Sequence, residues 1–195
     1  MMERILQLDT ELFLFFNGLH TPWADRFVYL LSQIWFWIPL YLLLIFLVFK
    51  FYRKKGWKVL LVFILAITLS DQACNLLKNS VQRLRPSHTE ALAGDIHLVQ
   101  KPDGNMYYGG KYGFPSAHAA NSMALAFLVF FFLSKGKKWV IVLAMAWSLL
   151  MAYTRLYLGV HYPTDILCGF IVGSCSAFLM TFMYRKWLSE ESFGK

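Results

Sequence analysis

The stretch TRLYLGVHYPTD, residues 154–165, lies between two long apolar runs. It places a cation, Arg155, a histidine, His161, and a carboxylate, Asp165, on a short connection between them. Ionisable groups are costly in hydrocarbon, so those found beside membrane-spanning segments are usually functional. The stretch therefore predicts a connection between two membrane helices that carries the chemistry of the protein.

The composition is that of a membrane protein. Of the 195 residues, 58% are hydrophobic and 18% are aromatic, which exceeds the apolar content of soluble domains. The net charge of +8 could suggest nucleic acid, but most lysines and arginines form short clusters between apolar runs, as membrane topology signals do. We therefore expect one integral-membrane domain, residues 1–195, in contact with the lipid bilayer and without nucleic acid as a partner.

Five apolar runs predict membrane crossings, because a spanning helix needs about 20 predominantly apolar residues. The second run ends in Asp71, Asn75 and Lys78, which share one helical face that must point into the bundle or toward water. In the last run, Gly169 and Gly173 form a small-residue surface that lets another helix approach closely. The five runs are residues 27–49, 59–78, 112–134, 139–154 and 166–184.

Two further segments complete the predicted fold. Residues 5–19 are amphipathic but too short and too charged to cross a bilayer, so they predict an interfacial helix. The fold class is therefore all-α, a polytopic membrane helix bundle with about five transmembrane helices plus an N-terminal interfacial helix. Residues 80–111 are the only long loop, and their composition leaves a lid, a binding surface and a mobile segment open.

The basic clusters predict the orientation in the membrane. If the crossings alternate, most of these clusters fall on one side, which the positive-inside rule assigns to the cytoplasm. The N-terminus, residues 80–111 and residues 154–165 then face outward. The residues expected on the cytoplasmic side are Lys50, Arg53, Lys54, Lys55, Lys58, Lys135, Lys137, Lys138, Arg185, Lys186 and Lys195.

Alternation also brings four helix ends with unusual polar residues to the outer face. Cations gathered there predict a bound anion, because each gains about 4 kcal/mol from a unit negative charge about 4 Å away at an effective dielectric of 20. Phosphate suits arginine because the two form paired hydrogen bonds. With Pro115 in the first turn of the third helix, the N–H groups near Ser116 would point at the anion. The cations are Lys78, Arg85 and Arg155.

Two histidines at the same face indicate covalent catalysis. Asp165 can hold one ring nitrogen of His161 protonated, which leaves the other nitrogen as a nucleophile. His118 can then protonate the leaving oxygen. The remaining histidines lack such neighbours and are expected to have structural roles. They are His20, His88 and His97.

These residues resemble the three-part signature of the type 2 phosphatidic acid phosphatases. The first part, Lys-(six residues)-Arg-Pro, corresponds to residues 78–86. The second, Pro-Ser-Gly-His, corresponds to residues 115–118 with Ala117 in place of glycine. The third, Ser-Arg-(five residues)-His-(three residues)-Asp, corresponds to residues 154–165 with Thr154 in place of serine. Neither departure removes a catalytic group, although the Ala117 methyl could tighten the phosphate cradle.

The resemblance implies a phosphatase that needs neither a metal nor another cofactor. His161 would attack phosphorus to form a phosphohistidine, Asp165 would orient His161, and His118 would protonate the leaving group and then activate water. The residues implied to hold the phosphoryl oxygens are Lys78, Arg85, Ser116, Ala117 and Arg155.

The substrate implied by the resemblance is a phosphate or diphosphate headgroup of a bacterial envelope lipid. Undecaprenyl diphosphate is the first expectation, because the chain is similar to the small family members that recycle this carrier. Phosphatidylglycerophosphate, phosphatidic acid and the phosphates of lipid A are the alternatives. The expected location is the bacterial inner membrane, with the site facing the periplasm or the cell exterior. The oligomeric state is not predicted.

Two other classes of function stay open. One is a metal-dependent hydrolase, although no ligand pair with metal-binding spacing is present in the sequence. The other is a transporter of lipid phosphates without enzymatic activity. The metal ligands of the first class would be drawn from His88, His97, His118, His161 and Asp165.

Overall fold

The computed structural model describes residues 2–193, and over that range the chain is all-helical, without β-strands. Two isolated β-bridges, between Leu84 and Tyr112 and between Gln100 and Met106, are the only extended pairing there. The helices are α1 (Met2–Gly18), α2 (Pro22–Leu31), α3 (Ile38–Tyr52), α4 (Gly56–Val81), α5 (Ala117–Leu128), α6 (Lys138–Tyr157) and α7 (Pro163–Phe193). A π-helical segment, Val129–Leu133, continues α5.

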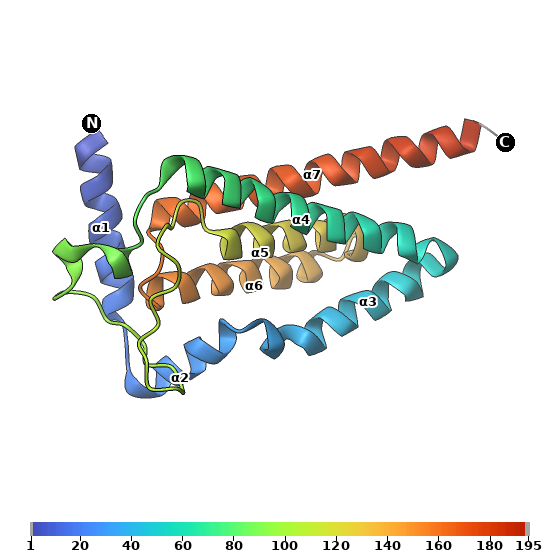
Figure 1. The fold of residues 1–195 in the computed structure, drawn as a ribbon. Coiled ribbons are helices and arrows are strands. Elements are labelled where there is room, and N and C mark those ends of the chain that lie inside the picture. Colours follow the sequence, from blue (N-terminus) through green and yellow to red (C-terminus); the bar gives the residue numbers. More distant parts are fainter. Residues whose placement is uncertain (1, 194–195) are drawn as a thin grey trace.

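Helices α4, α5, α6 and α7 form a bundle, while α3 diverges from it and α1 runs across one end (Figure 1). The α3–α4 turn, the α5–α6 turn and the carboxyl end of α7 lie at the opposite end (Figure 1). The basic clusters that follow α3 and α5 therefore share one end of the molecule. The polar residues singled out above lie toward the other end, beside α1.

Three segments of the described residues are long and apolar enough to cross a membrane. The first, Ile34–Val81, contains both α3 and α4, which fold back on each other. The others are Lys138–Tyr157 and Pro163–Trp187, and the apolar stretch Ala117–Leu133 is shorter. The all-α fold and the membrane-spanning character are thus as expected. The number of five crossings remains a prediction.

Close packing of α7 on α5 forms the centre of the bundle. A Cβ added to Gly169 would lie 2.5 Å from the Ser116 carbonyl oxygen, and one added to Gly173 would overlap the backbone of Ala120. The two glycines therefore let α7 approach α5 as the small-residue surface predicts. The contact sets the distance between the first turns of these two helices, which both carry residues of the predicted site.

The first apolar run is not one helix. Helix α2 ends at Leu31, and a 3-10 turn, Ile34–Trp37, separates it from α3. Pro39 is the second residue of α3, where its missing N–H does no harm, and this position favours a new helix start. The Trp37 indole donates to the Leu31 carbonyl at 2.7 Å, so a carbonyl freed by the break is paired. The expectation of an uninterrupted helix over residues 27–49 was wrong.

The long loop is packed against the end of the bundle near α1. The backbone N–H of Ser87 donates to the Gly159 carbonyl at 3.0 Å. Asn17 of α1 accepts from the His97 backbone N–H at 2.7 Å, and its amide donates to the Tyr157 carbonyl at 2.9 Å. These contacts join α1, the loop and the α6–α7 connection. The loop therefore covers this end of the bundle.

Candidate active site

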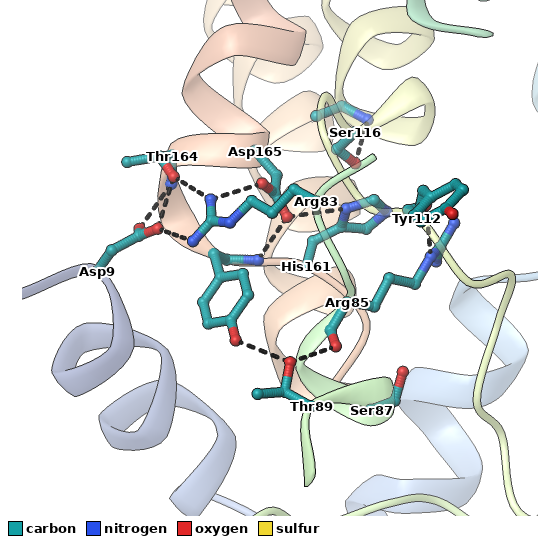
Figure 2. Close-up of polar contacts among 12 residues, drawn as sticks. Asp9, Arg83, Arg85, Ser87, Thr89, Tyr112, Ser116, His161, Thr164 and Asp165 are labelled. Atoms are coloured by element: carbon teal, nitrogen blue, oxygen red, sulfur yellow. Dashed lines mark hydrogen bonds and ion pairs between the residues drawn. The ribbon is translucent and has the colours of Figure 1, made fainter. Parts of the chain in front are cut away.

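The eight residues predicted for the site lie together at one end of the bundle. Lys78 is in the last turn of α4, and Arg85 follows in the extended segment after it. Arg155 lies near the end of α6. The start of α5 and the start of α7 complete the group, which Figure 2 shows in part. The residues at or just before those two helix starts are Ser116, Ala117, His118, His161 and Asp165.

The first turn of α7 positions the carboxylate. Pro163 is the first residue of the helix and Asp165 the third, as the sequence predicts. Asp165 is fully buried, and its Oδ2 accepts from the backbone N–H of Tyr162 at 2.9 Å, which is one of the two hydrogen bonds of a capping box. The same oxygen lies 3.4 Å from Nδ1 of His161. The carboxylate thus faces Nδ1 of the imidazole, and Nδ1 has no hydrogen-bond partner among the described residues.

His161 lies in the α6–α7 connection and is only 1% exposed. Burial lowers its pKa well below the ordinary value of 6.5. The positive charges of Arg85, Arg155 and Lys78 lower this pKa further. The imidazole is therefore neutral at pH 7 and keeps the lone pair that a nucleophile requires.

Arg155 is a buried cation with an unused donor. The side chain is 1% exposed, and its Nε donates to the hydroxyl of Thr154 at 3.0 Å. Its Nη2 has no hydrogen-bond partner among the described residues. A buried charge with an unpaired donor is unfavourable unless a ligand completes it, and an anion is the ligand that fits. Thr154 supplies the hydroxyl that the family's usual serine would supply.

Arg85 and Lys78 come from α4 and the segment that follows it, whereas Arg155 comes from α6. Both line one end of the large cavity described below. Arg85 donates from Nε to the Tyr112 carbonyl at 3.1 Å, which fixes its direction. Gly109 has φ +66°, and a Cβ there would lie 2.7 Å from Arg85 Nη1. Only glycine fits this backbone without moving the guanidinium.

The start of α5 differs from the expectation. The helix begins at Ala117 with Ser116 as its N-cap, so Pro115 precedes the cap and does not lie in the first turn. The Ser116 N–H donates to the Asp165 carbonyl at 2.9 Å, and its hydroxyl accepts from the Ala119 N–H at 3.4 Å. The Ser116 N–H is therefore not free for an anion. The N–H groups of Ala117 and His118 remain, because the first residues of a helix have no intrahelical acceptor.

Three residues in contact with this group or with one another beside it were not predicted from the sequence: Arg83, Asp9 and Thr164. Arg83 lies between two carboxylates and donates to Asp165 Oδ1 at 2.8 Å and to Asp9 Oδ2 at 2.7 Å (Figure 2). It also donates to the Thr164 hydroxyl at 2.7 Å. One signal was present in the sequence, since Arg83 and Arg85 are two residues apart and share a face in an extended segment. No sequence signal places Asp9 here.

The remaining histidines are engaged elsewhere. His97 Nε2 lies 2.9 Å from Asp25 Oδ1, and its ring stacks on that of His20 with centroids 3.7 Å apart. His88 packs beside Tyr108. The described residues contain no group of three or more His, Cys, Asp or Glu side chains arranged to hold a metal ion.

A cavity of about 710 Å³ extends from the site into the bundle. His118 is exposed toward it, and α3, α4, α5 and α6 contribute mostly apolar lining. Asp71 and Asn121 form a polar patch within it, where the Asn121 amide lies 3.4 Å from Asp71 Oδ1. Asn75 donates to Asp71 Oδ2 at 3.1 Å. The polar face at the end of α4 therefore makes hydrogen bonds within and between helices, and it also lines a cavity.

The comparisons with known proteins converge on one family. The protein-family model described as PAP2 superfamily matches residues 55–189 of this chain. A lipid A 4'-phosphatase of Bacteroides thetaiotaomicron is 39% identical over 95% of this chain and 81% of its own length. An undecaprenyl-diphosphatase of Sulfolobus acidocaldarius is 29% identical over 91% and 79%. The crystal structure of a transmembrane PAP2-type phosphatidylglycerolphosphate phosphatase from Bacillus subtilis has a TM-score of 0.69 at 25% identity, covering 94% of this chain and 87% of that one.

Proposed function

Since the chain belongs to the PAP2 superfamily and is a bacterial membrane lipid phosphatase, we propose that it removes a phosphate monoester from a glycolipid of the lipid A type. The observation that carries the proposal is the buried pair of His161 and Asp165 near the unpaired Arg155 donor. The neighbouring site residues Lys78, Arg85, Ala117 and His118 line a largely apolar cavity. A phosphorylated headgroup would occupy the polar end of the cavity and acyl chains the apolar part.

The proposed reaction has two steps. Nε2 of His161 attacks phosphorus, the bond from phosphorus to the lipid oxygen breaks, and His118 gives its proton to that oxygen. His118 then removes a proton from water, which attacks the phosphohistidine and breaks its P–N bond. Phosphate leaves, and both histidines return to their first state. Arg155 and Arg85 would hold the phosphoryl oxygens while charge develops on them.

Two observations support a lipid A type substrate over undecaprenyl diphosphate, our first expectation. The lipid A 4'-phosphatase is the more similar of the two relatives named above. In addition, Asp71 lies two helical turns, about 10 Å, from Lys78 along α4, and it presents acceptors to the cavity. An acylated amino sugar carries hydroxyl and amide donors near its phosphate, whereas a prenyl chain carries none.

Undecaprenyl diphosphate is the second candidate, because the Sulfolobus relative bears that name and the cavity is mostly apolar. Phosphate release from purified protein separates the two. We expect kcat/KM for lipid A to exceed that for undecaprenyl diphosphate, phosphatidylglycerophosphate and phosphatidic acid by at least about tenfold. Asp71→Ala should lower the value for lipid A by about tenfold, the effect of one charge-assisted hydrogen bond, and leave undecaprenyl diphosphate unaffected.

The control for this experiment is Gln72→Ala, on the exposed face of the same helix. It should leave both substrates unchanged. Higher kcat/KM for undecaprenyl diphosphate would reverse the assignment of the substrate. Equal losses on both lipids in Asp71→Ala would remove the role of Asp71 in recognition.

We further propose that the protein lies in the inner membrane with the site facing the periplasm. The basic clusters at the opposite end of the bundle support this orientation through the positive-inside rule. Asn105 is an exposed loop residue at the site end, so Asn105→Cys tests it. We expect an impermeant thiol reagent to label this cysteine in intact spheroplasts. Labelling only after the membrane is opened would reverse the orientation. The same assay on Asn105→Ser corrects for the native cysteines.

A further inference from the structure

We propose that Arg83 and Asp9 are positioning residues for the reaction, and that α1 thereby forms part of the catalytic unit. The inference rests on the proposed function in one respect, namely that His161 is the nucleophile and Asp165 orients it. Arg83 occupies one of the six positions that the first signature stretch leaves unspecified, and Asp9 lies outside all three stretches, on a helix that ends at Gly18.

Arg83 fixes the half of Asp165 that the α7 backbone leaves free. Oδ2 of Asp165 is held by the Tyr162 N–H, and Oδ1 accepts from Arg83 Nη1 at 2.8 Å. With both oxygens occupied, the carboxylate cannot rotate, and Oδ2 stays beside His161. The Arg83 guanidinium is itself held against the Tyr162 ring, 4.0 Å from its centroid. Its planar fork presents Nη1 to Asp165 and Nη2 to Asp9, an arrangement of two nitrogens that a lysine does not reproduce.

Asp9 completes the arrangement from a different helix. Its side chain is 1% exposed and accepts three hydrogen bonds (Figure 2). Oδ2 accepts from Arg83 at 2.7 Å and from the Thr164 hydroxyl at 2.6 Å, while Oδ1 accepts from the Thr164 backbone N–H at 2.9 Å. Thr164 is the second residue of α7, so Asp9 caps an unpaired N–H of that helix and complements its dipole.

The docking of α1 does not by itself require a charge at this position. Asp9, Phe13 and Asn17 are spaced four residues apart and form the buried stripe of α1. Phe13 packs on the Tyr162 ring, and Asn17 pairs with backbone groups of the loop and of α6. Burying a carboxylate costs desolvation free energy, so it is an unfavourable way to attach a helix unless the charge is paired with a partner. That partner is Arg83, which reaches Asp165.

A double-mutant cycle tests the inference with p-nitrophenyl phosphate, whose small size makes binding of a lipid tail irrelevant. Arg83→Lys keeps the charge but replaces the two nitrogens that contact the carboxylates with one, and Asp9→Asn keeps the shape but removes the charge. We expect each to lower kcat about 10- to 100-fold, as loss of a group that orients a catalytic ligand does, with KM within about threefold. In Asp165→Asn, adding Arg83→Lys should lower kcat by no more than about twofold.

Asn17→Ala is the matched control, because it weakens the docking of α1 without touching Arg83. It should lower the melting temperature and leave kcat of the folded protein unchanged. Equal kcat losses in Asn17→Ala and Asp9→Asn would mean that docking alone matters. Additive effects of Arg83→Lys and Asp165→Asn would also overturn the inference. If Asp165→Asn itself keeps full activity, the proposed function fails instead, so the two failures are distinguishable.

Discussion

His161→Ala is expected to abolish phosphate release, with a loss in kcat of about 10⁴-fold or more. The substitution removes the imidazole that faces Asp165, which is the proposed nucleophile, and among the described residues Asp165 has no ion pair with another histidine. Because the residue is buried, the variant must first be shown to fold by its melting temperature. Initial rates of phosphate release from lipid A and from p-nitrophenyl phosphate measure the effect.

His20→Ala is the control, because His20 is exposed and stacks on His97 away from the site. We expect its rate to match that of the unmodified protein. A retained rate in His161→Ala would contradict the phosphohistidine mechanism. Lipid-phosphate transport that survives the substitution in a vesicle assay would instead favour the transporter, the alternative class left open by the sequence.

The convergence of the candidate site could be predicted because its groups lie at the ends of apolar runs. Alternating crossings place the end of one helix beside the start of the next, so Arg155 and Asp165 are near each other whatever the detailed packing. The other site residues could be predicted from the spacing within each signature stretch, because that spacing is local in sequence. The roles of these residues remain predictions, which the two substitutions in this Discussion test.

Arg83 and Asp9 could not be found in the same way. The role we propose for them rests on a contact across 74 residues, which no local pattern predicts apart from the spacing of Arg83 and Arg85. Asp9 lies on an amphipathic helix where a charged residue normally faces water, and Glu11 on the same helix is exposed. Only the packing of α1 across the start of α7 turns Asp9 inward. The composition of residues 5–19 predicts a helix but not which of its polar residues is buried.

The sequence also predicted the positions of the helix ends less well than the presence of the helices. Hydropathy averages over a window, so it joined α2 to α3 across Ser32 and Gln33, although Pro39 was available as a sign of a new start. At α5, the preference of proline for the first turn of a helix placed Pro115 inside the helix. The backbone N–H of Ser116 instead pairs with the carbonyl of Asp165, a tertiary contact that competes with the local preference.

Arg155→Lys is expected to lower kcat/KM about 10²- to 10³-fold, the second-largest effect we predict. Nε of the guanidinium is held by Thr154 while Nη2 has no partner among the described residues, and the single nitrogen of an ammonium group does not reproduce this fork. The lost interaction is with the phosphoryl oxygens, where negative charge is greatest in the transition state. Vanadate resembles that state, so its inhibition constant should rise by a similar factor.

The comparison of the two measurements decides whether Arg155 acts on the transition state. Arg26→Lys makes the same chemical change on the exposed face of α2 and should alter neither kcat/KM nor inhibition by vanadate. If kcat/KM falls in Arg155→Lys while vanadate binds as before, Arg155 does not contact the reacting phosphoryl group. Parallel losses place the guanidinium on that group, because only an interaction made with the transition state weakens the rate and the binding of its analogue together.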